Sequence, residues 1–253
     1  MTGWALLVEY DGGPFIGWQR QDRGLSVQSV LETAAGKLTS RPTAVAAAGR
    51  TDAGVHAAGQ VAMVDLPDRF TAGQVRDALN FHLRPHRVVV VRAVPAPDGW
   101  HPRFSAIGRS YRYTILNRRS RPALQAGQVW HLPHPLDTAA MAEGARHLLG
   151  YHDFTSFRAS ACQALTPWRT LDRLDVVRAG DEIAVLAEAR SFLHHQVRNM
   201  AGTLALVGAG RWRPGDVMRA LAACDRTAAG PTAPAVGLCL TAVTYPQDLW
   251  KVG

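Results

Sequence analysis

The sequence is poor in several features, and each shortage excludes a class of protein. Its three cysteines, Cys162, Cys224 and Cys239, lie far apart and form no C-x-x-C pair, so neither a disulfide framework nor a cysteine-based zinc site is expected. No apolar run approaches the length that spans a bilayer, and the first residues do not resemble a secretory leader. We therefore expect a protein without membrane segments in the reducing setting of the cytoplasm.

Charged residues are also scarce, and lysine is almost absent. Only 19% of the 253 residues are charged, yet 28 Lys and Arg against 20 Asp and Glu give a net charge of +8. Just two of the basic residues are lysines, Lys37 and Lys251. With 47% hydrophobic residues the chain has the composition of a folded protein, so the positive charge indicates a basic surface rather than disorder.

Three windows contain no acidic residue and hold the whole positive excess. Residues 99–136, 154–171 and 189–215 carry twelve arginines, which leaves 28 − 12 = 16 basic residues against all 20 acids elsewhere. Arginine concentrated in this way suits a polyanion such as nucleic acid, although each window could also be an ordinary solvated face. None of the windows has the apolar face of a membrane-binding helix.

The hydrophobic periodicity predicts two successive α+β halves. The first half has strands over 4–10, 43–48, 60–65 and 87–94, and helices that begin at Ser26 and Thr71. The second has strands over 110–117, 171–178, 183–190 and 237–245, with helices over 137–149, 195–207 and from Pro214. This order suggests two related lobes that share a sheet, with a cleft suited to a long ligand.

The densest motif is Gly-Arg-Thr-Asp-Ala-Gly-Val-His over 49–56, between two predicted strands. Two glycines around a carboxylate permit a tight turn that presents Asp52 outward, and Arg50 can keep that carboxylate ionised. An ordinary strand connection with an Asx-type turn explains the same residues. Spacing alone therefore leaves a catalytic role for Asp52 open.

The motif, with its neighbours, resembles the signature of the pseudouridine synthases of the tRNA pseudouridine synthase A (TruA) type. The similarity continues over nearly the whole chain, in family order, in the segments 9–12, 17–21, 103–106, 111–113, 153–158, 166–169, 192–199, 225–227 and 237–238. Together with the periodicity, it implies an α+β fold of two pseudo-symmetric ferredoxin-like lobes. We expect lobes 1–105 and 106–253, a mainly antiparallel sheet that joins them, helices on one face and an active-site cleft between the lobes.

The resemblance also assigns catalytic roles. Asp52 matches the aspartate that attacks the target nucleotide, on either the base or the ribose. Tyr111 matches the tyrosine that stacks on the target base and handles a proton, and Arg198 matches the basic partner of the aspartate. Arg50 matches the arginine that fills the space of the flipped nucleotide, and Leu238 resembles an apolar residue packed near the base. These types suit the task, because base flipping needs an aromatic platform and a space-filling side chain.

Other expectations concern substrate and partners. Family resemblance implies isomerisation of uridine to pseudouridine at positions 38, 39 and 40 of the tRNA anticodon stem-loop by a homodimer, without cofactor or metal. Contacts with tRNA are expected from residues 100–104, which include Arg103 and Phe104, from Arg119, and from 161–165, which lacks a basic residue that relatives can carry there. The histidine pairs 82/86, 131/134 and 194/195 lack a third ligand at metal-binding spacing, so no metal site is predicted.

Two alternatives remain. The basic windows and repeated α+β order would also fit an RNA-binding module without catalysis, although the closely spaced strand aromatics of an RRM are absent. A hydrolase of glycosidic bonds would need a second acid near Asp52 and would release free uracil.

Overall fold

The computed structural model describes residues 1–251, which form two compact units. Unit 1 comprises 1–108 and the described residues from Leu240 on, and unit 2 comprises Arg109–Cys239. We expected one boundary at 105/106, whereas the chain leaves unit 1 at Gly108 and returns to it within the last strand. None of the helices within residues 1–251 is long and apolar enough to cross a membrane.

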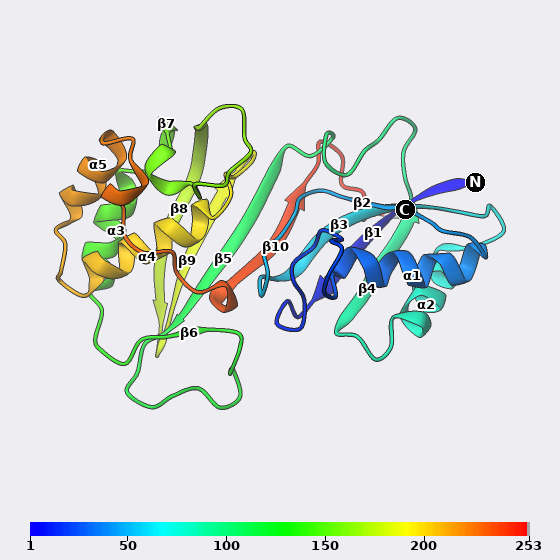
Figure 1. Cartoon of the computed structure of the whole chain (residues 1–253), viewed down its shortest axis with the longest axis horizontal. Helices are drawn as coiled ribbons and strands as arrows, with labels where there is room; N and C mark the ends of the chain where they lie inside the picture. Colours follow the sequence, from blue (N-terminus) through cyan, green and yellow to red (C-terminus); the bar gives the residue numbers. More distant parts are fainter. Residues whose placement is uncertain (252–253) are drawn as a thin grey trace. The chain divides into compact units, whose positions relative to one another are not determined.

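Unit 1 has the order βαββαβ followed by the returning strand. Its elements are β1 (Thr2–Tyr10), α1 (Val27–Thr39), β2 (Val45–Ala47), β3 (His56–Leu66), α2 (Ala72–Leu83), β4 (Val88–Pro95) and most of β10 (Leu238–Thr244). The strands run in the order β4-β1-β3 with β2 and β10 beside β3, and β1 pairs antiparallel with both β3 and β4. This is the ferredoxin-like arrangement. The helices α1 and α2 contact each other, and both pack on the strands of this unit (Figure 1).

Unit 2 repeats the scheme with additions. It holds β5 (Gly108–Leu116) from Arg109 on, β6 (Trp130–His131), α3 (Thr138–Arg146), β7 (Gly150–Asp153), β8 (Trp168–Ala179), β9 (Glu182–Ala189), α4 (Gln196–Gly208) and α5 (Pro214–Ala222). Its strand order is β5-β9-β8-β7, with antiparallel pairs throughout, and β6 adds a parallel pair to β5. The order β5-β9-β8 corresponds to β1-β3-β2 of unit 1. The predicted α+β class with mainly antiparallel pairing is confirmed.

Local sequence signals set the helix starts. Ser26 and Thr71 cap α1 and α2 through side chains that accept from the N–H three residues on, and Asp137 does the same for α3. Pro214 occupies the first turn of α5. Between β8 and β9, Gly180 has φ +57°, which suits the two-residue hairpin turn at this point.

Each unit has its own core of fully buried side chains. In unit 1 these include Leu6, Trp18, Leu31, Leu66, Leu79 and Leu83, and in unit 2 Tyr113, Ile115, Met141, Phe154 and Phe157. On β5 burial alternates from Arg112 to Ile115, because Tyr113 and Ile115 are buried while Arg112 and Thr114 remain half-exposed. The apolar faces therefore hold each unit's strands against its helices.

Some of the predicted elements differ from the structure. The helix expected to reach Leu149 ends at Arg146, because the next turn tightens and leads into Gly150 at φ +98°. The strand β3 begins at His56 rather than at residue 60, because its first residues pair with the end of β1. The short strands β6 and β7 were not predicted, since so few residues carry no periodic signal.

Candidate functional site

Asp52 lies in a turn that is fixed by a second loop of unit 1. The N–H of Val55 donates to the Asp52 carbonyl at 3.1 Å and closes the turn, in which Gly54 has φ +78°. Gly17 forms an isolated antiparallel bridge to Asp52, and the Trp18 N–H donates to the Thr51 carbonyl at 2.9 Å. The half-buried Asp52 is thus held through the backbone on both sides of the turn.

Gly17 is required for this contact. Its φ is +111°, and a Cβ there would lie 2.7 Å from the Thr51 carbonyl oxygen, closer than real Cβ contacts. Its absence of a side chain lets two loops that are far apart in sequence meet backbone to backbone. This close approach gives a physical reason for the glycine in the segment 17–21.

A buried polar network lies beneath the turn. The Tyr10 hydroxyl and Thr51 Oγ1 are 2.8 Å apart, and the amide of Gln60 donates to the Gly49 carbonyl at 2.9 Å and contacts the Tyr10 hydroxyl at 3.4 Å. All three side chains are buried, so each lost bond would leave a polar group without water. We did not predict Gln60 as part of the site; a fully buried amide is a signal that only tertiary structure reveals.

The other end of the turn is held by residues from the end of β1. His56, which is buried, has Nδ1 3.0 Å from the Gly12 nitrogen and 3.1 Å from Asp11 Oδ1. Burial by itself would raise the pKa of Asp11, but the Gly13 N–H, the Arg87 guanidinium and His56 outweigh it and lower that pKa. Asp11 therefore stays ionised beside the turn at neutral pH.

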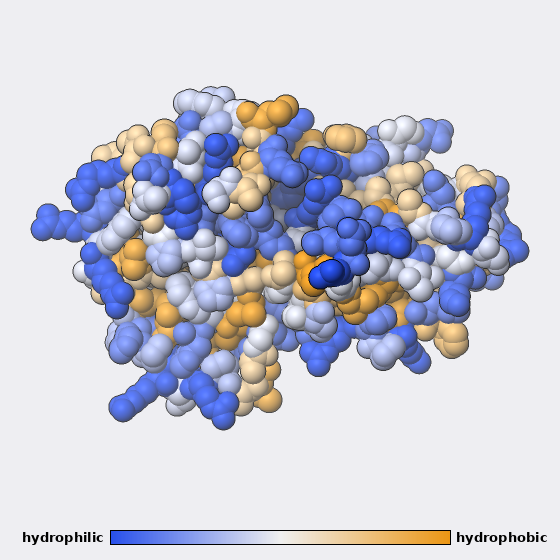
Figure 2. Space-filling model, viewed as in Figure 1, coloured by the Kyte–Doolittle hydropathy of each residue, from blue (hydrophilic) through white to orange (hydrophobic). Residues whose placement is uncertain are grey.

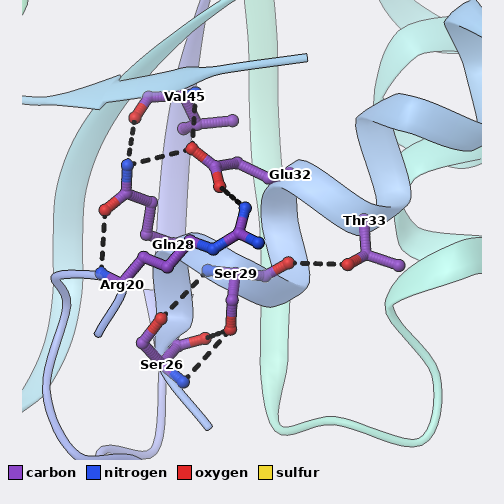
Figure 3. Close-up of polar contacts among 7 residues, drawn as sticks. All are labelled: Arg20, Ser26, Gln28, Ser29, Glu32, Thr33 and Val45. Atoms are coloured by element: carbon purple, nitrogen blue, oxygen red, sulfur yellow. Dashed lines mark hydrogen bonds and ion pairs between the residues drawn. The ribbon is translucent and has the colours of Figure 1, made fainter. Parts of the chain in front are cut away.

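The segment 17–21 is also tied to α1 and β2 (Figure 3). The backbone N–H of Arg20 donates to Gln28, and its guanidinium forms a 3.2 Å ion pair with Glu32. Glu32 Oε1 also accepts from Gln28 at 2.9 Å and from the Val45 N–H at 3.3 Å. One carboxylate on α1 thereby connects a loop that supports the Asp52 turn to the strand that leads into it.

Next to this network is an open hollow of about 540 Å³. Its wall includes three basic residues, Arg20, Lys37 and Arg41, and one acid, Glu32, which already accepts three hydrogen bonds. Lys37 and Arg41 are exposed and lie outside the acid-free windows. The wall has a net positive charge and can hold an anionic group such as a phosphate.

The other predicted residues of unit 1 are exposed. Arg50 is exposed two residues before Asp52, and Phe104 is 75% exposed. The Arg103 guanidinium lies 5.7 Å from the centre of the Phe104 ring, and the His101 ring lies 4.6 Å from it. An exposed aromatic ring with a guanidinium beside it is the kind of surface on which an unpaired base stacks.

Unit 2 carries Tyr111 on β5. Its half-buried ring makes an edge-on contact with Phe192 at 5.2 Å, with the planes at 90°. This geometry is favourable for aromatic pairs and restrains the orientation of the Tyr111 ring. The contact partner, Phe192, begins the segment 192–199 on which the sequence resemblance partly depends.

Arg198, on the first turn of α4, is held by the segment that leads to β10. Its Nε donates to the Ala233 carbonyl at 2.8 Å, and the Ala233 N–H donates back to the Arg198 carbonyl at 3.1 Å. Arg226 reinforces the segment with bonds to Gly230, Thr232 and Asn199. Arg198 is thus half-buried, with its guanidinium stem fixed by backbone.

The same segment places Leu238, which is 6% exposed at the start of β10. Before it, a Cβ on Gly237 would lie 2.7 Å from the Tyr113 ring, so only glycine lets the chain lie on that ring. The Tyr113 hydroxyl donates to the Pro234 carbonyl at 2.8 Å. Burial raises the pKa of Tyr113 far above its ordinary value, and the positive charge of Arg198 offsets part of this, so Tyr113 is a structural donor and not a proton carrier at neutral pH.

Most of the arginines in the acid-free windows are exposed. Seven of their twelve arginines are exposed: Arg103, Arg118, Arg119, Arg121, Arg190, Arg211 and Arg213. Some form ion pairs with acidic residues outside the windows, as Arg118 does with Asp181 at 3.5 Å. Hydrophilic side chains cover much of the face in Figure 2, with only small apolar patches between them. This surface suits an anionic partner more than an apolar one.

The sequence-predicted residues are therefore distributed over both units. Unit 1 carries Arg50, Asp52, Arg103 and Phe104, and unit 2 carries Tyr111, Arg119, Arg198 and Leu238. Among the histidines considered as ligands, His131 bonds the Arg118 carbonyl at 2.8 Å and His82 packs edge-on against Phe81. Both have ordinary structural contacts.

Comparison with known proteins agrees with these features. A family model described as tRNA pseudouridine synthase matches residues 6–105 and 145–246. The chain is 66% identical to the tRNA pseudouridine synthase A of Acidiphilium cryptum, over 98% of each chain. It is 60% identical to that of Paramagnetospirillum magneticum, over 100% of this chain and 99% of the relative, and 58% identical to that of Rhodospirillum centenum, over 97% and 100%. The family model matches most of this chain, and the relatives match it over their full length at high identity. The chain therefore belongs to the tRNA pseudouridine synthase family.

Proposed function

We propose that this protein isomerises uridine to pseudouridine at positions 38, 39 and 40 of the tRNA anticodon stem-loop, with Asp52 as the nucleophile. The observation that carries the proposal is the Asp52 turn, which is held by the Gly17 bridge, by the bond from Trp18 to Thr51 and by the network beneath it. A rigid support of this kind is what a nucleophile needs to meet its target in one geometry.

The reaction breaks the bond between ribose C1′ and uracil N1 and forms a bond from C1′ to C5. Asp52 attacks either the base or the ribose and leaves again, so that the detached uracil rotates and rejoins through C5. The proton on C5 is then lost, and N1 gains one. Atoms and electrons balance without an oxidant, a reductant or a released product, so the reaction requires no cofactor or metal.

The other residues have distinct tasks in this proposal. Tyr111, oriented by Phe192, stacks on the target base and handles the proton, and Arg198 stabilises the ionised aspartate. The target base must leave its stack, at a cost of roughly a few kcal/mol, and the exposed Arg50 fills the vacated space. Leu238 packs near the base.

The surrounding surface binds the rest of the tRNA. Arg103 with Phe104, and Arg119, supply a stacking platform and positive charge that contact phosphates and unpaired bases. We expect the enzyme to act as a homodimer in the cytoplasm, with one tRNA held across both subunits. No membrane is involved in this proposal.

The test is tritium release from tRNA labelled at C5 of uridine, with pseudouridine mapped at each position. Asp52→Asn keeps the size of the side chain but removes the nucleophile, and Asp65→Asn changes an exposed carboxylate on β3 of the same unit as a matched control. We expect no detectable release from Asp52→Asn and full release from Asp65→Asn. Activity in Asp52→Asn would overturn the proposed mechanism.

Two other outcomes would replace the function itself. Wild-type protein that binds tRNA and leaves every uridine unchanged would be an RNA-binding module. Free uracil among the products would indicate hydrolysis of the glycosidic bond.

A further inference from the structure

His56 is the residue of the Asp52 motif for which the proposed reaction has no role. It lies at the start of β3, four residues after Asp52, and is 8% exposed. The Gly12 N–H points at its Nδ1 from 3.0 Å, so Nδ1 acts as an acceptor and the ring proton sits on Nε2. Within residues 1–251, Nε2 is buried and has no hydrogen-bond partner.

Asp11 offers the ring a competing arrangement. Its Oδ1 lies 3.1 Å from the same Nδ1, and the carboxylate already accepts from the Gly13 N–H at 2.9 Å and from Arg87 at 2.6 Å. If Nδ1 gains a proton, it becomes a donor that can bond Asp11 but can no longer accept from Gly12. Protonation of His56 thus exchanges one bond for the other.

The hydrogen bond from the Gly12 N–H to His56 Nδ1 supports the Asp52 turn. Gly12 lies so close to Val55 that a Cβ on Gly12 would be 2.1 Å from the Val55 carbonyl oxygen. Val55 in turn donates its N–H to the Asp52 carbonyl. A shift of Gly12 relative to the His56 ring therefore passes through Val55 to the backbone of Asp52.

We propose that His56 is a positioning residue for Asp52, which in its neutral form accepts the Gly12 N–H and so fixes the catalytic turn. Protonation of His56 releases Gly12 and lowers turnover as the pH falls. The charged groups that face the ring are Asp11, from the end of β1, and Arg87, which precedes β4 and acts through Asp11. The inference rests on the proposed role of Asp52.

Two substitutions distinguish the role of the hydrogen-bond acceptor at the Nδ1 position from the role of the imidazole ring itself. In His56→Asn the amide oxygen can take the place of Nδ1 and accept from Gly12 without titrating, whereas His56→Gln places its polar atoms nearer to Nε2. We expect His56→Asn to keep kcat within a few-fold of wild type at pH 8 and to lose the fall in kcat that the proposal predicts for wild type as the pH is lowered. We expect His56→Gln to lower kcat about tenfold or more at every pH with little change in KM, because a displaced turn affects the reaction more than tRNA binding.

The outcomes separate this inference from the proposed function. The inference is wrong if His56→Gln has wild-type kcat, or if His56→Asn retains the acid limb of wild type. If Asp52→Asn is active, the proposed function fails instead, whatever the His56 variants do. Circular dichroism and thermal unfolding show which variants fold at the assay temperature.

A second measurement needs no variant. In wild-type enzyme labelled with ¹⁵N-histidine, the ring nitrogens report which of them carries the proton. We expect the Nε2–H form of His56 at pH 8. A proton on Nδ1 at that pH would overturn the inference, even if no substituted protein folds.

Discussion

Gly12→Ala is expected to lower turnover strongly, because Gly12 and the Asp52 turn are in backbone contact. The added Cβ would lie 2.1 Å from the Val55 carbonyl oxygen and 2.4 Å from its carbon. An ordinary Cβ contact begins near 3.4 Å, so the two segments must separate by about 1.3 Å. Val55 cannot relieve the contact by a rotamer change, because its carbonyl oxygen and carbon are backbone atoms.

The size of the effect follows from this displacement. A misplacement of about 1 Å can cost about 10²-fold in rate, which corresponds to about 2.7 kcal/mol of transition-state stabilisation. We expect the loss mainly in kcat, because the residues proposed to bind tRNA are other ones. Forced separation should also lower the free energy of unfolding, by about 1–3 kcal/mol.

Gly49→Ala is the matched control for this prediction. It lies in the same motif, three residues before Asp52, but a Cβ there would meet no atom within 4 Å. The assay is single-turnover tritium release for wild type and both variants, with thermal unfolding measured alongside. A Gly12→Ala enzyme within about threefold of the wild-type kcat would refute the reasoning that Gly12 sets the position of the Asp52 turn.

Three further predictions concern other parts of the molecule. The pKa of Asp11 in the folded state lies below its ordinary 3.8, so the ionised carboxylate stabilises the fold above pH 3.8, and this stabilisation is lost as the pH falls through the folded pKa. In denaturant unfolding, Asp11→Asn should therefore have a lower free energy of unfolding than wild type at pH 6. The difference between the two free energies should narrow below pH 3.8. Tyr113→Phe removes the bond to the Pro234 carbonyl and should cost about 1 kcal/mol in urea unfolding, while an unchanged midpoint would contradict a role for that bond. If about six exposed arginines contact phosphates, the logarithm of tRNA affinity should fall with the logarithm of salt concentration with a slope of about −4 to −5, and a slope near zero would show that the acid-free windows face something else.

Much of the fold follows from local signals in the sequence. Side chains such as Ser26, Thr71 and Asp137 cap helices because each can accept an N–H only a few residues away. From Arg112 to Ile115 of β5, the alternation of polar and apolar residues matches which side chains are buried. The short strands β6 and β7 escaped prediction because pairing with distant strands, and not their own residues, makes them strands.

The sequence by itself determined the family and the identity of the candidate residues, above all Asp52 in its motif. The tertiary structure decided what supports that residue: the Gly17 bridge, the buried amide of Gln60 and the acceptor nitrogen of His56. It also decided that most of the last strand joins unit 1. The physical reason is the same in each case, because these contacts join residues that are many positions apart in the chain. A pattern of neighbouring residues does not indicate which distant backbone groups come into contact.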